Sequence, residues 1–295
     1  MKRIATILAI ATISVSAMAQ GLDFLNISAD PESFALAGAT VARDADAFAT
    51  ENNVAAAALS DKKFAVAASY GMWAPDMANT NNIGFGAFYR HDKLAFTLGA
   101  KYNLHQPYDA YNQVARQLES FTPSEYSAAV GFAYSIIDHL SAGINAKFVS
   151  STLAEGISGT AFGVDLSFMY NTESIKAGLS VNNIGSSIKY DKTAYGMPVN
   201  VRAGAAYSIA GFTASGEVDY ITSAGVMAAL GAEYWIADIV AVRAGYHYGN
   251  AEKTMPSFVS AGLGLKFAGV NLGAAFLFGS EPLAKTMMFS LGYAF

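Results

Sequence analysis

Eight charged residues are the first candidates for chemistry, because each stands within a run of alternating apolar residues. Four are basic and four acidic: Lys101, Lys147, Arg202 and Arg243 with Asp165, Glu217, Asp219 and Glu233. An anion pore favours a ring of one sign, Arg or Lys, which this balance does not supply. We therefore expect paired networks that brace the inside of a wall, with a path for a charged substrate as the alternative.

The residue types of catalytic sites carry no recognisable motif here. The four histidines are His91, His105, His139 and His247, and none lies in a Gly-x-Ser-x-Gly or His-Glu-x-x-His context. Cysteine is absent, which excludes disulfides, thiol chemistry and a lipid-acylated cysteine. We expect no enzyme activity, no cofactor and no metal site. A hydrolase that assembles Ser and His from neighbouring strands is the alternative.

The elements that position these charges are β-strands, since hydrophobicity alternates with period two, as from Leu94 to Leu104. This period fits a strand with one face in lipid and excludes a helix. Fourteen such runs begin near Phe64, Asn81, Leu94, Glu125, Leu140, Ser158, Ser174, Pro198, Phe212, Gly225, Ile239, Ser257, Val270 and Thr286. An even number suits a bacterial single-chain barrel. Twelve or sixteen strands are the alternatives.

The composition also favours a transmembrane antiparallel β-barrel, an all-β fold. Hydrophobic residues make up 53% and charged residues 14% of the chain, whereas about a quarter of a globular domain is charged. Polar residues or glycines interrupt each apolar run after the N-terminus, so a closed barrel is the structure that pairs all backbone groups in lipid. The net charge of −5 argues against a nucleic-acid partner.

The N-terminus has the pattern of a secretory signal peptide. A basic start at Lys2 and Arg3 precedes a short apolar run and the small residues Ala17 and Ala19. We expect cleavage after Ala19, export, and a location in the Gram-negative outer membrane. A membrane anchor, which needs about 20 apolar residues, is the alternative.

The mature chain divides into two parts. Residues 20–60 are rich in Ala and Asp and precede the first strong strand, so we expect a plug, or hatch, inside the lumen. An extra strand with a periplasmic extension is the alternative. Residues 61–295 form the barrel, and its last strand ends in Phe295, which resembles the assembly signal of outer-membrane barrels.

Connections alternate in length, and outer-membrane barrels have short periplasmic turns and longer outer loops. The longest outer connection runs from His105 to Ser124 and is the expected docking surface or lid. Its candidate contact residues are Tyr108, Tyr111, Leu118 and Phe121.

One strand breaks its alternation at Asn182 and Asn183, which predicts a β-bulge. The bulge either opens the wall sideways to lipid or only curves the barrel.

Several short segments of the chain resemble the PorV/PorQ group of Bacteroidetes outer-membrane proteins, relatives of the FadL-type transporters of hydrophobic compounds. These segments are 34–39, 142–148, 163–166, 181–185, 197–204, 231–234 and 242–246. One departure is Asn53-Val54-Ala55, where the family usually carries Asn-Pro-Ala.

The resemblance implies a fourteen-stranded barrel with an N-terminal hatch that works with the type IX secretion system. Its partners would be other secretion components or the C-terminal domains of secreted proteins, docked on the outer loops. A FadL-like passive transporter of hydrophobic small molecules is the alternative function, and a structural barrel without transport activity is a third.

Overall fold

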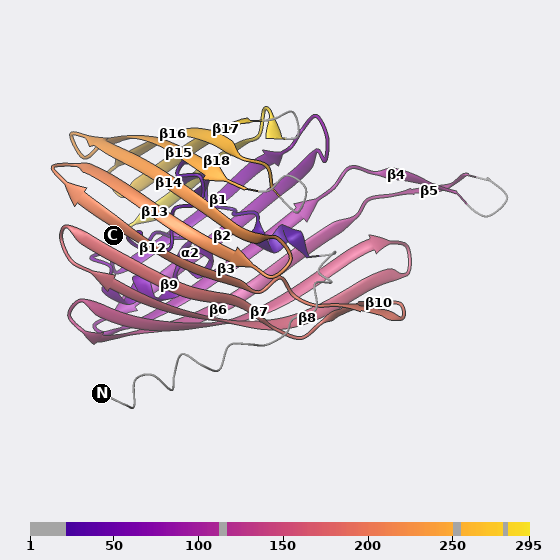
Figure 1. Cartoon of the computed structure of the whole chain (residues 1–295), viewed down its shortest axis with the longest axis horizontal. Coiled ribbons are helices and arrows are strands. Elements are labelled where there is room, and N and C mark those ends of the chain that lie inside the picture. The colour runs from indigo at the N-terminus through magenta and orange to yellow at the C-terminus, as the bar shows by residue number, and fades with distance from the viewer. Residues whose placement is uncertain (1–21, 112–116, 250–254, 280–282) are drawn as a thin grey trace.

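The computed structural model describes residues 22–111, 117–249, 255–279 and 283–295. The expected signal peptide lies outside these residues. Fourteen antiparallel strands close into one barrel, so the predicted fold class and strand number are confirmed (Figure 1). Within the described ranges, no helix is both long and apolar enough to cross a membrane.

The strands follow one another around the barrel in chain order. They are β1 (Phe64–Trp73), β2 (Thr80–His91), β3 (Leu94–Leu104), β6 (Ser124–Ile137), β7 (Leu140–Ala154), β8 (Ile157–Asn171), β9 (Ile175–Gly185), β12 (Asn200–Ile209), β13 (Phe212–Ile221), β14 (Gly225–Ile236), β15 (Val240–Tyr248), β16 (Phe258–Phe267), β17 (Val270–Gly279) and β18 (Met287–Ala294). Their starts lie within a few residues of the predicted ones because the alternation is continuous along each strand.

Alternation of burial shows which face of the wall meets lipid. Along β6, inward residues are buried and outward residues exposed almost without interruption. Outward side chains include Phe96, Val130 and Phe162, which are 53%, 59% and 64% exposed. Apolar surface of this extent on every strand is stable against lipid rather than water.

The last strand closes the barrel on the first. β18 pairs antiparallel with β1 from Ala65↔Ala294 to Met72↔Met287. Beyond this ladder, Phe295 and Phe64 exchange two backbone hydrogen bonds of 3.0 Å, and their rings lie 5.6 Å apart. Closure leaves no unpaired sheet edge at this seam.

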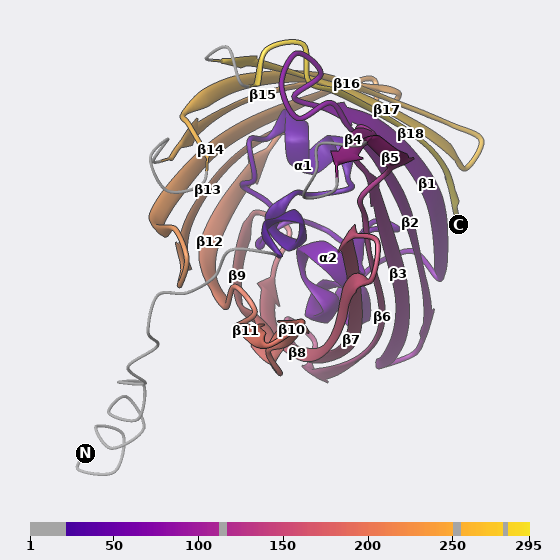
Figure 2. The ribbon, with the colours of Figure 1, turned by 90° about the vertical axis from the view of Figure 1, so that its right-hand side faces the viewer.

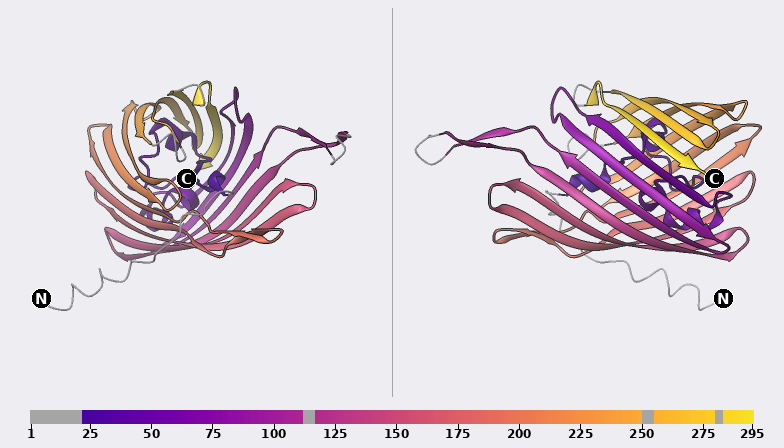
Figure 3. Two further views of the ribbon diagram at one scale, coloured as in Figure 1. Left: turned by 45° about the vertical axis from the view of Figure 1, so that its right-hand side comes forward. Right: turned by 180° about the vertical axis from the view of Figure 1, so that it is seen from behind.

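The two ends of the barrel differ. At one end, which we name the turn end, strands are joined by tight turns such as Ala210-Gly211, where both residues have positive φ. Such turns match the twist of the paired strands. At the opposite end, the loop end, most connections are longer, except 155–156 after β7 and 222–224 after β13, and one hairpin projects from the wall (Figure 3).

Two short hairpins stand at the loop end in addition to the barrel. β4 (Tyr108–Tyr111) pairs with β5 (Gln117–Phe121), and β10 (Ile188–Tyr190) pairs with β11 (Thr193–Tyr195). From the sequence we expected the first of these regions, within the connection from His105 to Ser124, to be a loop.

Residues 22–60, the lumenal segment, lie inside the barrel (Figure 2). The segment contains η1 (Asp23–Asn26), α1 (Pro31–Ala35), α2 (Ala49–Asn52) and η2 (Val54–Leu59). Asp30 caps α1, since its carboxylate accepts from the backbone N–H groups of Glu32 and Ser33 at 2.9 and 3.2 Å. The alanines of η2 pack with Ala95, Ala133 and Met169 of the wall in one buried cluster.

Glycine on the inner wall makes this packing possible. A Cβ at Gly245 would lie 2.6 Å from the carbonyl carbon of Leu36, and one at Gly143 would lie 2.7 Å from the backbone nitrogen of Ala55. Side chains at these positions would push the lumenal segment off the wall.

Candidate functional site

Arg202 lies at the centre of the first lumen cluster. Its guanidinium lies 2.6 Å from Glu217 Oε1 and donates to Thr40 Oγ1 at 2.8 Å and to the carbonyl of Asn52 at 3.1 Å. Glu217 Oε2 accepts from the backbone N–H groups of Thr40 and Val41 at 2.6 and 2.7 Å. The pair therefore ties β12 and β13 to the lumenal segment.

Arg243 lies at the centre of a second cluster. Its Nε donates to Glu233 Oε2 at 2.5 Å, and its Nη2 lies 3.2 Å from Glu32 Oε2 in α1. Glu32 also pairs with Arg43. Burial alone would raise the pKa of Glu32, but Arg243 and Arg43 outweigh it and hold that pKa at about 2. The second cluster binds α1 to β14 and β15.

The predicted bulge lies in β9 opposite Asp165. Pairing with β8 runs Val164↔Ile184 and Leu166↔Val181, so Asn182 and Asn183 together face one residue. Asn183, with φ 62°, donates its backbone N–H to Asp165 Oδ1 at 2.7 Å.

Lys147 braces this bulge from the lumen side. Its Nζ lies 3.0 Å from Asp165 Oδ2 and donates to Asn183 Oδ1 at 2.7 Å. The amide of Asn183 donates to the carbonyl of Pro198 at 3.0 Å, where the ladder between β9 and β12 has already ended at Asn182↔Asn200. The bulge is thus closed by side chains.

The remaining predicted lumen residues are Lys101 and Asp219. Lys101 Nζ donates to the carbonyls of Ile27 and Leu25 at 2.6 and 3.4 Å, which makes it another anchor of the lumenal segment. Asp219 Oδ1 lies 3.7 Å from Arg202 Nε, too far for a hydrogen bond. Each of the eight predicted charged side chains thus makes its contacts on the lumen side of the wall.

A cavity of about 300 Å³ lies between the lumenal segment and the wall. One part of its lining is polar and includes Lys147, Asn183, Asn200, Arg202 and Asp219. Another part is apolar and contains Phe34, Trp73, Ile221, Met227 and Phe258. In the described part of the chain, no group of His, Asp and Glu is placed to hold a metal ion.

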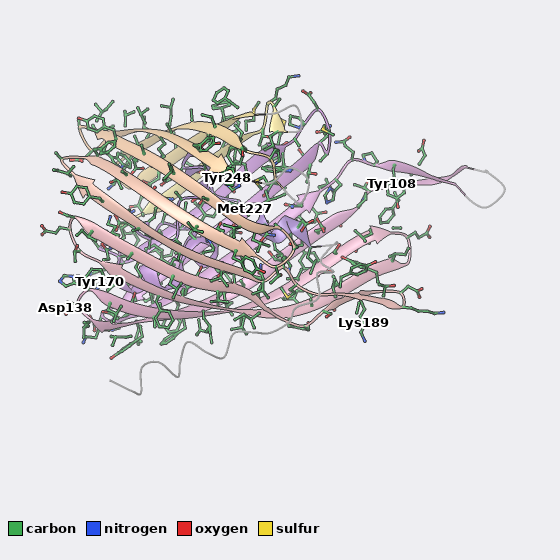
Figure 4. All side chains as sticks on the ribbon, viewed as in Figure 1. Tyr108, Asp138, Tyr170, Lys189, Met227 and Tyr248 are labelled. Atoms are coloured by element: carbon green, nitrogen blue, oxygen red, sulfur yellow. The ribbon has the colours of Figure 1, made fainter. Side chains whose placement is uncertain are left out.

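The β4–β5 hairpin stands clear of the barrel at the loop end (Figure 4). Tyr108 is 41% exposed, its ring lies 6.0 Å from that of Phe121, and its hydroxyl donates to the carbonyl of Leu153 in β7 at 3.1 Å. The side chains of Tyr111 and Leu118 are outside the described part of the structure.

The β10–β11 hairpin leaves the barrel ladder after β9 and packs against β8. Ile188 and Tyr190 are buried with Met197, and they pack with Leu22 and Phe24 of the lumenal segment. Close approach to β8 depends on Gly159, where a Cβ would lie 2.7 Å from Cγ1 of Ile188. This cluster escaped the sequence analysis because Ile188 and Tyr190 alternate just as lipid-facing residues do.

The partners in the lumenal segment also escaped the sequence analysis. Glu32, Thr40, Arg43 and Asn52 receive or donate the contacts that the wall charges make. The one local signal was Asp30-Pro31, a helix-start pattern three residues before Ser33.

Comparison with known families decides the identity. A sequence model of the family described as type IX secretion system protein PorV matches residues 11–265. The chain belongs to the PorV family. It is therefore an outer-membrane barrel of the type IX secretion system. No curated protein matches the chain.

Solved structures similar to this PorV family member are FadL-like barrels. The CymD monoaromatic hydrocarbon channel matches with a TM-score of 0.67 and 14% identity over 91% of this chain and 97% of that one. The Pseudomonas putida toluene transporter TodX matches with 0.64 and 12% over 89% and 95%. A Pseudomonas aeruginosa FadL homologue matches with 0.61 and 12% over 95% and 99%. Identities this low establish the fold alone.

Proposed function

We propose that this PorV family barrel docks a protein partner through the β4–β5 hairpin at its loop end. The observation that carries the proposal is that the hairpin projects beyond the barrel with Tyr108 exposed, its ring 6.0 Å from that of Phe121. Aromatic side chains that project in this way are the usual anchors of protein interfaces. Family membership supports a secretion component or a secreted C-terminal domain as the partner.

The lumenal segment favours a docking function over the passage of solutes through the barrel. We propose that residues 20–60 act as a plug, because both arginine clusters and Lys101 hold the segment inside the wall. A barrel filled in this way serves as a rigid platform. The same proposal includes removal of a signal peptide after Ala19, which N-terminal sequencing of the mature protein tests by reading Gln20 first.

Affinity purification tests the docking function. The tagged barrel is extracted from its native outer membrane in mild detergent, and co-purifying proteins are identified by mass spectrometry against an untagged strain. We expect surface-attachment subunits or exported proteins that share one C-terminal domain. Recovery of the barrel alone in several detergents would contradict docking.

A second candidate is passive transport of hydrophobic small molecules. It is favoured by the likeness to proteins described as hydrocarbon channels and a toluene transporter. The polar lining of the cavity and the braced bulge weigh against it, because a hydrophobic solute gains little from charged walls. Toluene flux into liposomes that contain the barrel, above that of empty liposomes, would support transport. No enzyme activity is proposed.

A further inference from the structure

The lumen cavity presents hydrogen-bond acceptors that no group in the described part of the chain satisfies. They are Asn200 Oδ1, Asp219 Oδ1 and His247 Nε2. Asn200 and His247 are more than nine-tenths buried, and all three residues line the cavity. A buried acceptor without a donor destabilises the fold, so such a set indicates a ligand that brings donors.

The protonation of His247 follows from its other ring nitrogen. Nδ1 lies 3.2 Å from the carbonyl oxygen of Ala37, so Nδ1 carries the proton and donates it. Nε2 is then a lone-pair acceptor. On the wall side of the cavity the unsatisfied atoms are therefore acceptors, on β12, β13 and β15, whereas Asn26 Nδ2 and Thr50 Oγ1 are the unsatisfied atoms on the lumenal segment.

The charged side chains that line the cavity also favour a ligand with a positive charge. Lys147 and Arg202 are neutralised by Asp165 and Glu217, which stand beside them. Asp23 and Glu51 remain against Lys101, whose Nζ already bonds two backbone carbonyls, and Asp219 lies 3.7 Å from Arg202, with which Glu217 already pairs. Acidic side chains in an enclosed lumen create a field that attracts a cation.

The apolar part of the lining completes the recognition chemistry. Phe258 stacks on His247 with ring centroids 4.8 Å apart, and Ile221 and Met227 line the same cavity. Trp73 and Phe34 meet edge to face at 5.7 Å and pack in one apolar cluster with Phe258. Aromatic and aliphatic walls bind an apolar body, and an aromatic face also favours a cation.

We propose that this cavity binds a small organic cation, an amine or guanidinium carried on a compact apolar body. The cationic group donates to Asn200, Asp219 and His247, and its body lies against Ile221, Met227 and Phe258. The proposal goes beyond docking and does not depend on it, because the site lies inside the barrel and involves no residue of the β4–β5 hairpin.

Three probes of one shape test the charge preference. Benzylamine, benzyl alcohol and benzoate are titrated into the purified full-length barrel in detergent, and thermal unfolding and calorimetry are followed. Benzylamine should raise the unfolding temperature with concentration, as a ligand of the folded state does. Benzyl alcohol and benzoate should have little effect. Equal shifts with all three, or no binding of benzylamine at about 10 mM, would overturn the proposal.

A substitution that keeps the size and shape of the side chain tests whether the ligand binds in this cavity. Asp219→Asn should weaken benzylamine binding at least about tenfold, because it replaces the carboxyl group that faces the cation by an amide. Asp238→Asn, in an exposed turn at the opposite end, is the matched control and should bind as the parent does. His247→Phe keeps the ring stack and removes the acceptor, so it should also weaken binding. Unchanged affinity in both lumen variants, with heat-modifiable gel mobility retained, would refute the site.

Discussion

The two hairpins at the loop end differ in where their apolar side chains lie. In β10–β11, Ile188 and Tyr190 are buried against the lumenal segment. In β4–β5, Tyr108 and Phe121 contact each other and leave Tyr108 exposed (Figure 4). The first hairpin packs within the chain, whereas we propose that the second presents a surface for another molecule. The length of a loop is therefore not enough to predict a docking surface, because the apolar side chains of a long loop can be buried within the same chain.

The largest expected effect comes from a charge in the buried hairpin. Ile188→Asp places a carboxylate in a site that is closed to solvent, and we expect a loss of about 3–5 kcal/mol in the free energy of unfolding. Urea unfolding of the barrel in detergent measures this change. Trp73 fluorescence reports the lumen side, because Trp73 packs against Phe34. A loss below about 1 kcal/mol would mean that the hairpin is not held by the lumen.

A smaller effect, on binding instead of stability, is expected in the projecting hairpin. Replacing Tyr108 and Phe121 by Ala should weaken partner binding by about 2–4 kcal/mol, as the loss of aromatic anchors does. The unfolding free energy should change by under about 1 kcal/mol, because Tyr108 is exposed. Partner recovery from equal amounts of barrel measures the first quantity. Stability lost in proportion to binding would remove the contrast between the hairpins.

Protonation of Glu32 should weaken the attachment of the lumenal segment to the wall and should not affect the β4–β5 hairpin. The pKa of Glu32 is held at about 2, below its ordinary 4.5, so its ionised form stabilises the folded state. That stabilisation is fully present above pH 4.5 and is lost as the pH falls towards 2. Hydrogen exchange of residues 22–60 should therefore rise as the pH falls from about 4 to 2, and exchange of β4–β5 should not. Above this range Asp46 acts in the opposite sense, because burial and Asp30 raise its pKa to about 8. Glu32→Gln is the control, and it should show the smaller acid dependence.

The smallest effect is expected at the outer face of the buried hairpin. Lys189 is exposed at the loop end and takes part in no ion pair within the described residues (Figure 4). Lys189→Ala should change stability and partner binding by under about 0.5 kcal/mol. The same two assays measure this, and a loss of binding comparable to that of the aromatic variant would make β10–β11 part of the interface.

The fold could be predicted from the sequence because alternation is a local property. Each strand shows its lipid face residue by residue, as Leu94 to Leu104 does in β3, and the phase break at Asn182 marked the bulge. The inward direction of Arg202 and Arg243 followed from the same parity.

The partners of these charges could not be predicted. Glu32, Thr40 and Asn52 lie in short helices and turns without periodicity, far along the chain from Arg202 and Arg243. The burial of Ile188 could not be predicted either, because a hairpin that packs on the lumenal segment has the same alternation as a lipid-facing strand. What distinguishes the two is a tertiary contact, with Leu22 and Phe24, that no local pattern encodes.

Site-specific photo-crosslinking tests the docking account most directly. A photoreactive phenylalanine analogue replaces Tyr108 in one strain and Lys189 in another, and both are irradiated in the native outer membrane. We predict a discrete crosslinked protein at position 108 and none, or a much fainter one, at position 189. Equal crosslinks at both positions, or none at position 108 while the barrel is folded and abundant, would contradict the claim that β4–β5 is the docking surface.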